Sequence, residues 1–199
     1  MRPSWHEYFL DLAIKAATRS TCTRAHHGAV IVRDKNVIST GYNGSAPGAP
    51  HCDDVGCEVE NFHCQRCLHA EMNAIIQAAK NGVRTKDADM YVTALPCYNC
   101  IKAIANAGIY TVYYAGYYTD DPRVYQVARE AGVRMVDLSQ PPFNLKSYQE
   151  RLNEAEMQEE TTDEPQDTPD YDELCRKMKE FAENFFGIMP NVRVEVEHD

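Results

Sequence analysis

The chain has 199 residues, 44% of them hydrophobic, which suits one well-packed domain with an extension, and no apolar run approaches the roughly 20 residues that span a bilayer. The chain has a net charge of −10, and residues 153–199 carry it, with 15 Asp and Glu against four Lys and Arg. Residues 1–152 are nearly neutral and lack the basic stripe of a nucleic-acid binder. Because the start does not resemble a signal peptide, we expect a cytoplasmic protein that binds neither a nucleic acid polymer nor a membrane.

The first third of the sequence predicts a helix, a hairpin and a long loop. Residues 4–20 open with a Ser-x-x-Glu capping box and continue with apolar residues at helical spacing. Residues 28–32 and 37–40 are short runs rich in β-branched residues on either side of a polar turn, which is typical of a β-hairpin. Residues 41–67 show no hydrophobic periodicity and predict a loop rich in cysteine.

The middle of the chain alternates between helical and strand patterns. Strands joined through a helix usually lie parallel in one sheet, with right-handed crossovers. The sequence therefore predicts a three-layer α/β domain with a mixed sheet of about five strands and flanking helices. The predicted helices cover residues 69–81, 97–107 and 122–131, and the predicted strands cover 90–93, 110–114 and 133–136.

The last part of the chain differs in composition from the rest. We expect one domain over residues 1–152. Residues 153–170 are acidic and rich in Thr, Gln and Pro, which predicts a disordered linker. Residues 171–199 predict a small extension, with helical spacing at first and then an alternating pattern typical of an edge strand.

Two short motifs carry the chemistry. His69-Ala70-Glu71 opens one predicted helix, and Pro96-Cys97-Tyr98-Asn99-Cys100 opens the next. An imidazole and two thiolates make a three-ligand zinc site, and four-coordinate zinc then keeps one position for water, as catalytic zinc sites do. We expect the partial positive charge of both helix N-termini to favour the thiolates. The pattern is the signature of zinc-dependent deaminases.

Glu71 is the predicted catalytic residue. Hydrolytic deamination needs a hydroxide at neutral pH, which zinc supplies, and a carboxylate that moves protons to the ring nitrogen and to the leaving amine. Glu71 lies two residues from His69 and suits this task without binding the metal. The alternative is a closed zinc site that only joins two helices. That alternative requires a fourth protein ligand and leaves the position of Glu71 unexplained.

Seven segments together closely resemble deoxycytidylate (dCMP) deaminases of the cytidine-deaminase-like superfamily, including bacterial relatives encoded in late-competence operons. The resemblance covers about residues 4–137 and excludes the acidic linker and the extension. It implies a cytidine-deaminase-like fold, conversion of dCMP to dUMP, a homo-oligomer that is often a hexamer, and dCTP and dTTP as effectors. The segments are Ser20–Cys22, Gly28–Val32, Gly41–Ser45, His51–Gly56, His69–Ala74, Tyr91–Thr93 and Pro96–Cys100.

The resemblance also implies substrate contacts. Asn43 is expected to bind the deoxyribose, Ala70 to offer a backbone N–H to the base, and Tyr118 to line the nucleotide pocket. A simpler interpretation makes Asn43 a turn residue and Tyr118 a packing residue. We interpret Arg24 as a solvated loop charge, with a phosphate contact as the alternative.

The remaining cysteines predict a second, structural zinc ion, because a metal can replace the core that the loop cannot form. Five thiols are available, accompanied by His26, His27, His51 and His63. Four of the thiols match metal-binding positions of the competence-operon relatives, and Cys67 is the reserve ligand, because Cys64-x-x-Cys67 is itself a zinc-knuckle spacing. Free buried thiols are the alternative. The predicted ligands are Cys22, Cys52, Cys57 and Cys64.

Two other functions remain open at this stage. Another enzyme of the superfamily would act on cytidine, a riboflavin precursor, guanine or a tRNA adenosine. A non-catalytic zinc protein linked to competence is the alternative from a different class. The nearly neutral domain disfavours tRNA, and the complete set of His69, Glu71, Cys97 and Cys100 disfavours a non-catalytic protein.

Overall fold

A computed structural model describes residues 2–60, 63–118, 121–159 and Arg176. It contains the helices and strands that the sequence predicts between residues 4 and 137, with ends shifted by a few residues. In chain order these elements and the ones not predicted are α1 (Trp5–Ala17), β1 (Gly28–Arg33), β2 (Asn36–Tyr42), α2 (Cys52–Val55), β3 (Val59–Glu60), β4 (His63–Cys64), α3 (Ala70–Lys80), β5 (Asp89–Val92), α4 (Tyr98–Asn106), β6 (Thr111–Tyr114), α5 (Pro122–Ala131), β7 (Arg134–Asp137) and α6 (Tyr148–Glu159).

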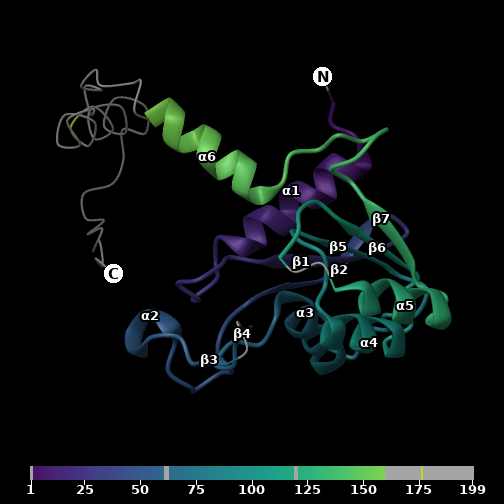
Figure 1. Cartoon of the computed structure of the whole chain (residues 1–199), viewed down its shortest axis with the longest axis horizontal. Helices are drawn as coiled ribbons and strands as arrows, with labels where there is room; N and C mark the ends of the chain where they lie inside the picture. Colours follow the sequence, from purple (N-terminus) through teal and green to yellow (C-terminus); the bar gives the residue numbers. More distant parts are fainter. Residues whose placement is uncertain (1, 61–62, 119–120, 160–175, 177–199) are drawn as a thin grey trace, which may run out of the picture. The chain divides into compact units, whose positions relative to one another are not determined.

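Five strands form one mixed sheet in the order β2-β1-β5-β6-β7. β1 pairs antiparallel with both β2 and β5, while β5, β6 and β7 run parallel through the crossover helices α4 and α5. The predicted mixed sheet of about five strands is therefore confirmed. Because β5 leads directly into α4, the carboxyl end of this central strand delivers the start of α4 to one edge of the sheet (Figure 1).

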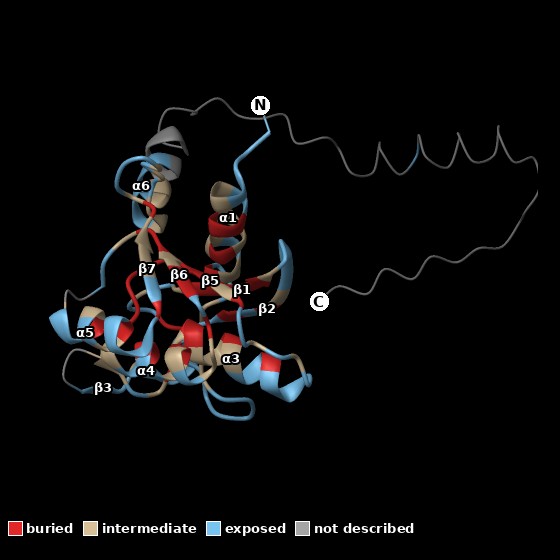
Figure 2. Cartoon of the chain, turned by 90° about the vertical axis from the view of Figure 1, so that its right-hand side faces the viewer, coloured by how far each residue is buried: buried red, intermediate tan, exposed pale blue. Residues whose placement is uncertain are grey.

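Helices cover both faces of the sheet, which makes the predicted three layers. Figure 2 shows α1 on one face and α3, α4 and α5 on the other, with the buried residues concentrated between them. The alternation along β1 explains this arrangement, since successive side chains of a strand point to opposite faces. Ala29 and Ile31 join the core under α3 and α4, whereas Val30 and Val32 pack with Phe9 and Leu10 of α1.

Two glycines let helices approach the hairpin closely. A Cβ atom on Gly28 would lie 1.9 Å from the carbonyl oxygen of Ala13 in α1. On Gly41 it would lie 2.3 Å from the oxygen of Ala70 and 2.4 Å from the nitrogen of Ala74, both in α3. The absence of a side chain at Gly41 therefore allows α3 to lie close to β2, and this close approach sets the position of the residues at the start of α3.

Gly41→Ala should lower the free energy of unfolding by about 2 kcal/mol or more, because backbone atoms of α3 must move to admit the methyl group. Urea denaturation followed by circular dichroism measures the change. Gly44→Ala is the matched control, since its Cβ would be 3.3 Å from the Thr21 hydroxyl, a side-chain atom that can shift slightly. Equal midpoints for the two variants would show that the approach of α3 does not depend on Gly41.

The structure corrects the predicted linker in part. Residues 153–159 belong to α6, so the start of the segment that we expected to be disordered is helical. Helix α6 is held by polar contacts that a search for apolar periodicity does not detect. Ser147 and Glu150 cap its first turn, Lys146 pairs with Glu154 at 2.6 Å, and Arg151 pairs with Asp11 of α1.

The rest of the linker and the predicted helix-strand extension lie outside the described residues, apart from Arg176. The cysteine-rich loop contains short elements that the sequence did not predict, namely α2 and a two-stranded sheet of β3 and β4. No helix in the described part of the chain is both long and apolar enough to cross a bilayer.

Candidate active site and metal centres

The two motif halves meet at the N-termini of α3 and α4. His69 is the N-cap residue of α3 and Cys97 is the N-cap residue of α4, and both have extended backbone conformations. Cys100 follows in the first turn of α4. Because each cap residue precedes its helix, its side chain lies next to the free N–H groups and the positive end of the helix dipole.

The three side chains form a set of donors suited to zinc. The Sγ atoms of Cys97 and Cys100 each lie 3.4 Å from Nδ1 of His69, and all three ligand atoms lie within 4.8 Å of one another. A tetrahedral zinc ion, with bonds of about 2.3 Å to sulfur and about 2.1 Å to nitrogen, holds such atoms about 3.5 Å apart. The residues therefore fit a zinc ion with one position left open.

The protonation of this set also favours a cation. The hydrogen bond from Cys100 and the neighbouring His69 lower the pKa of Cys97 to about 3, so Cys97 is a thiolate at neutral pH. The hydrogen bond to Cys97 raises the pKa of His69 to about 9, and the Cys97 sulfur together with burial raises the pKa of Cys100. Binding a metal ion would release the protons that His69 and Cys100 hold in its absence.

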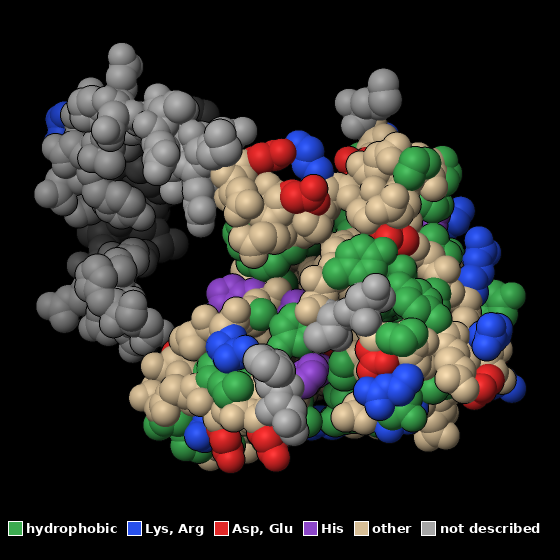
Figure 3. All heavy atoms as spheres, viewed as in Figure 1, with side chains coloured by type: hydrophobic (Ala, Val, Ile, Leu, Met, Phe, Trp, Pro, Cys, Tyr) green, Lys and Arg blue, Asp and Glu red, His purple; other side chains and the backbone are tan. Residues whose placement is uncertain are grey.

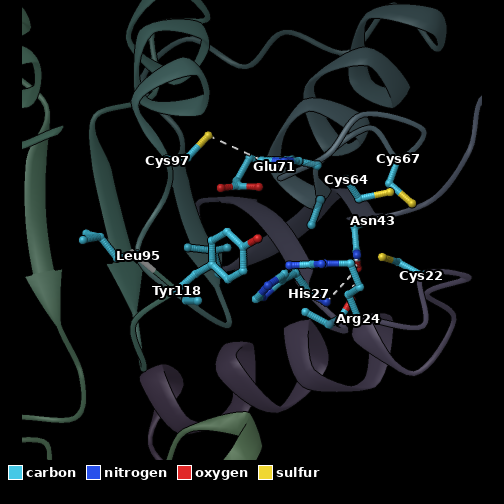
Figure 4. A pocket seen from close by; sticks show the side chains of 15 residues that line it. Cys22, Arg24, His27, Asn43, Cys64, Cys67, Glu71, Leu95, Cys97 and Tyr118 are labelled. Atoms are coloured by element: carbon cyan, nitrogen blue, oxygen red, sulfur yellow. Dashed lines mark hydrogen bonds between the residues drawn. The ribbon is translucent and has the colours of Figure 1, made fainter. Parts of the chain in front are cut away.

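Glu71 lies in the first turn of α3 and is 5% exposed. Burial raises the pKa of its carboxyl group, and the charge of His69 opposes this shift. Such a carboxyl group is easier to protonate than an exposed one, as a proton shuttle requires. Figure 4 shows the Glu71 carboxyl group directed into the same space as the Tyr118 ring, beside the sulfur of Cys97.

That space is a cavity with a volume of about 50 Å³. It adjoins a wider cavity of about 420 Å³, and Arg24, His27 and Tyr118 line both cavities. The start of α6 forms the far side of the wider cavity. Figure 3 shows histidine side chains at the surface in the hollow between α6 and the cysteine-rich loop. The narrow cavity is lined, among others, by Asn43, Cys64, Cys67, Ala70, Glu71, Leu95 and Cys97.

The three predicted substrate residues all line the narrow cavity. Asn43 is 5% exposed and its amide already binds the backbone, with Oδ1 accepting from the N–H of His27 at 2.7 Å and Nδ2 donating to the oxygen of Ala25 at 2.8 Å. An amide has two acceptor and two donor positions, so one of each remains for a ligand. The Asn43 side chain therefore holds the backbone of residues 25–27 in the cavity wall.

The second cysteine group is also assembled. The sulfurs of Cys22, Cys52, Cys57 and Cys64 all lie within 4.8 Å of one another, with separations of 3.6 Å between Cys22 and Cys57 and between Cys52 and Cys64. A tetrahedral zinc ion holds two sulfurs about 3.8 Å apart. The four predicted thiols therefore fit a closed zinc site.

The fifth thiol and the nearby histidines lie outside this group. The sulfur of Cys67 is 3.4 Å from that of Cys52, but among the described residues the set that can share an ion contains neither Cys67 nor a histidine. Burial opposes ionisation of Cys64, yet backbone N–H groups of Cys67 and Arg66 help to lower its pKa to about 6. Cys67 thus contacts a predicted ligand, Cys64, through its backbone.

The two groups share a wall. Cys22, Cys64 and Cys67 line the narrow cavity together with Glu71 and Cys97. Burial raises the pKa of Cys22, while the N–H groups of Arg24 and Ala25 bind its sulfur and oppose that shift. The turn around Cys22 therefore sets the course of the chain toward Arg24 and His27, which makes the cysteine group part of the architecture of the cavity.

The sequence interpretation missed one residue of this wall. We counted His27 among spare histidines near the second metal, but its ring lines both cavities. A histidine directly before an apolar strand was the only sequence signal.

A three-layer α/β fold that places an open His-Cys-Cys donor set beside a buried glutamate defines a zinc-dependent deaminase. The cytidine and deoxycytidylate deaminase zinc-binding region matches residues 3–116. ComE operon protein 2 of Bacillus subtilis (strain 168) is 48% identical over 148 residues, which are 73% of this chain and 78% of that protein. The chain therefore belongs to the cytidine and deoxycytidylate deaminase family.

Two further relatives carry more specific names. The deoxycytidylate deaminase of Saccharomyces cerevisiae is 39% identical over 145 residues, which cover 70% of this chain but only 46% of the yeast protein. The crystal structure of the dCMP deaminase from cyanophage S-TIM5 in complex with dCMP and dUMP has a TM-score of 0.61 and 30% identity, covering 69% of this chain and 98% of that one.

Proposed function

We propose that the protein hydrolyses dCMP to dUMP and ammonia. The observation that carries this proposal is the position of the buried Glu71 carboxyl group in the cavity beside His69, Cys97 and Cys100. The names of the yeast and cyanophage relatives support dCMP in particular, since both are dCMP deaminases. His69, Cys97 and Cys100 would hold a zinc ion, which supplies the hydrolytic nucleophile at neutral pH.

The residues of the chain have distinct roles in this reaction. Glu71 accepts one proton from the attacking water and delivers it to the ring nitrogen N3. It then takes the second proton from the new hydroxyl group on C4 and delivers it to the exocyclic amine, which leaves as ammonia, so that a C4=O bond replaces the C4–N bond. The raised pKa of Glu71 suits both directions of transfer. The backbone N–H of Ala70 binds the base, and the cavity walls exclude bulk water.

The two cavities suggest how a nucleotide lies. The narrow cavity beside Glu71 suits the planar base, and the wider cavity suits the sugar and phosphate. Asn43 binds the deoxyribose with its remaining amide positions, and Tyr118 covers the nucleotide. Arg24, which we had interpreted as a solvated loop charge, lines both cavities, which supports a contact between its guanidinium group and the phosphate.

Further features of the proposal follow from the resemblance. We propose a homo-oligomer, which in proteins of this type is often a hexamer, with dCTP and dTTP as effectors. The second zinc ion is structural and bound by Cys22, Cys52, Cys57 and Cys64. The cysteines in the described part of the chain are all free, which supports a reducing compartment such as the cytoplasm.

A substrate comparison tests the choice of dCMP. Ammonia release is measured for the zinc-loaded protein with dCMP, deoxycytidine, cytidine and dCTP. We expect kcat/KM for dCMP to exceed that for deoxycytidine by about 10- to 100-fold, since one charged phosphate contact, such as the one proposed for Arg24, contributes about 1.5–3 kcal/mol. Faster reaction with cytidine than with dCMP would point instead to another enzyme of the superfamily.

A further inference from the structure

His27 has a buried polar atom that the fold leaves without a partner. His27 directly precedes β1, and its side chain forms part of the wall of both cavities. The Nε2 atom is inaccessible to solvent and has no hydrogen-bond partner among the residues that the structure describes. Buried nitrogen atoms of this kind are normally paired, so an unpaired one next to a ligand cavity calls for a ligand atom.

The backbone of His27 is held rigidly in place. Its N–H donates to Oδ1 of Asn43 at 2.7 Å, and its carbonyl oxygen accepts from the N–H of Asn43 at 3.1 Å. The following residue, Gly28, is bound to Thr93 through both its N–H and its oxygen. The imidazole therefore projects from a fixed segment, as binding residues do when their geometry is set before the ligand arrives.

The hydrogen bonds of Thr93 favour one position of the proton on the His27 ring. The Thr93 hydroxyl is buried and accepts from the N–H of Gly28 at 3.2 Å. In the described part of the chain, Nδ1 of His27 lies 3.5 Å from this hydroxyl oxygen and can accept its proton. We assign the Thr93 hydroxyl as the donor to Nδ1, which puts the hydrogen of the neutral ring on Nε2.

The ring is neutral at physiological pH. Burial, together with the charges of His69 and His26, lowers the pKa of His27 to about 4. A neutral imidazole with its hydrogen on Nε2 offers a single donor to the cavity. The complementary group on a ligand is an oxygen acceptor, such as a pyrimidine carbonyl or a phosphate oxygen.

We propose that His27 is a substrate-binding residue, whose Nε2–H donates a hydrogen bond to an oxygen acceptor of the nucleotide. This inference rests on the proposed function and adds to it a specificity-determining residue from outside the metal motifs. The ring of Tyr118 packs edge-on against His27 with centroids 5.3 Å apart. The pair thus forms a joint wall at the boundary between the narrow and the wide cavity.

Two substitutions at the same position test the proposal. His27→Leu removes the donor and keeps much of the side-chain volume, whereas His27→Gln keeps an N–H donor at about the reach of Nε2. We expect His27→Leu to weaken dUMP binding, measured by calorimetry, and to raise KM for dCMP by about 5- to 10-fold with little change in kcat. His27→Gln should recover most of that loss.

Thermal unfolding of both variants checks that the fold is retained. A rise in KM for dCMP but not for deoxycytidine identifies the phosphate oxygen as the acceptor, and an equal rise for both identifies the base carbonyl; each supports the proposal. Wild-type affinity in His27→Leu, or equal losses in the Leu and Gln variants, overturns it. If the wild-type protein binds neither dUMP nor dCMP, the proposed function itself fails, and the role of His27 fails with it.

Discussion

Glu71→Gln should reduce kcat for deamination by about 10³-fold or more while the protein keeps its zinc. The substitution preserves the size of the side chain but removes the group that accepts and returns protons, and general acid–base catalysis by one residue contributes about 10²- to 10⁴-fold. Glu71 is buried and its carboxyl group has a raised pKa. Among the described residues that line the narrow cavity, no other Asp or Glu can take its place. Steady-state ammonia release and metal analysis of the same sample measure both quantities.

Glu130→Gln is a matched control for this experiment. Glu130 lies on α5, accepts a hydrogen bond from Gln126 and is exposed to solvent. The Glu130→Gln variant should keep full activity and full zinc content. If Glu71→Gln deaminates as fast as this control, Glu71 is an ordinary helix residue and the proposed proton transfer is wrong.

Cys52→Ser should lower the zinc content from two ions per chain to one. Cys52 is 1% exposed, and its sulfur lies 3.6 Å from that of Cys64, at the centre of the cysteine group. Because a structural zinc site contributes about 10 kcal/mol or more of folding free energy in small domains, we expect a loss of about 3 kcal/mol or more even within a larger fold. Metal analysis and urea denaturation measure these two changes.

Cys67→Ser is the comparison that separates a ligand from a neighbour. Its sulfur is buried and lies 3.4 Å from Cys52, yet it is outside the group of four that can share an ion. It should retain two zinc ions and lose only about 1 kcal/mol. A loss of zinc from Cys67→Ser, with zinc retained in Cys57→Ser or Cys22→Ser, would show that the predicted ligand set is wrong.

The cysteine group also has a consequence for binding. The backbone N–H groups of Arg24 and Ala25 bind the Cys22 sulfur, and the same segment continues to His27 in the cavity wall. Loss of the second metal ion should therefore disturb the wall more than the chemistry at Glu71. In Cys52→Ser we expect KM to rise by a larger factor than kcat falls.

The central fold was predictable because its elements follow simple periodic patterns. The apolar run of β1 and the capping box before α1 are both present in the structure, with the Ser4 hydroxyl accepting from the N–H of Glu7. The meeting of His69 with Cys97 and Cys100 follows from two helices that start at the same sheet edge. The short helix α2 and the strands β3 and β4 were not predictable, because thiol packing rather than apolar periodicity shapes them.

Three other features need three-dimensional information. Helix α6 could not be predicted, because polar pairs between residues distant in sequence, such as Arg151 with Asp11, help to hold it. The unpaired Nε2 atom of His27 cannot be predicted from the sequence, because it depends on the hydrogen bonds that surrounding residues make. The use of the Asn43 amide by the backbone of residues 25–27 is of the same kind, since it depends on a contact between two loops.

The most direct test of the central claim is product analysis with dCMP. Zinc-loaded protein is incubated with dCMP, and dUMP and ammonia are quantified together. Zinc-dependent deamination at Glu71 predicts that the two products form in a one-to-one ratio, and that the reaction stops after chelation and resumes when zinc is restored. Unchanged dCMP in the presence of protein that holds two zinc ions per chain would contradict it and favour a non-catalytic zinc protein.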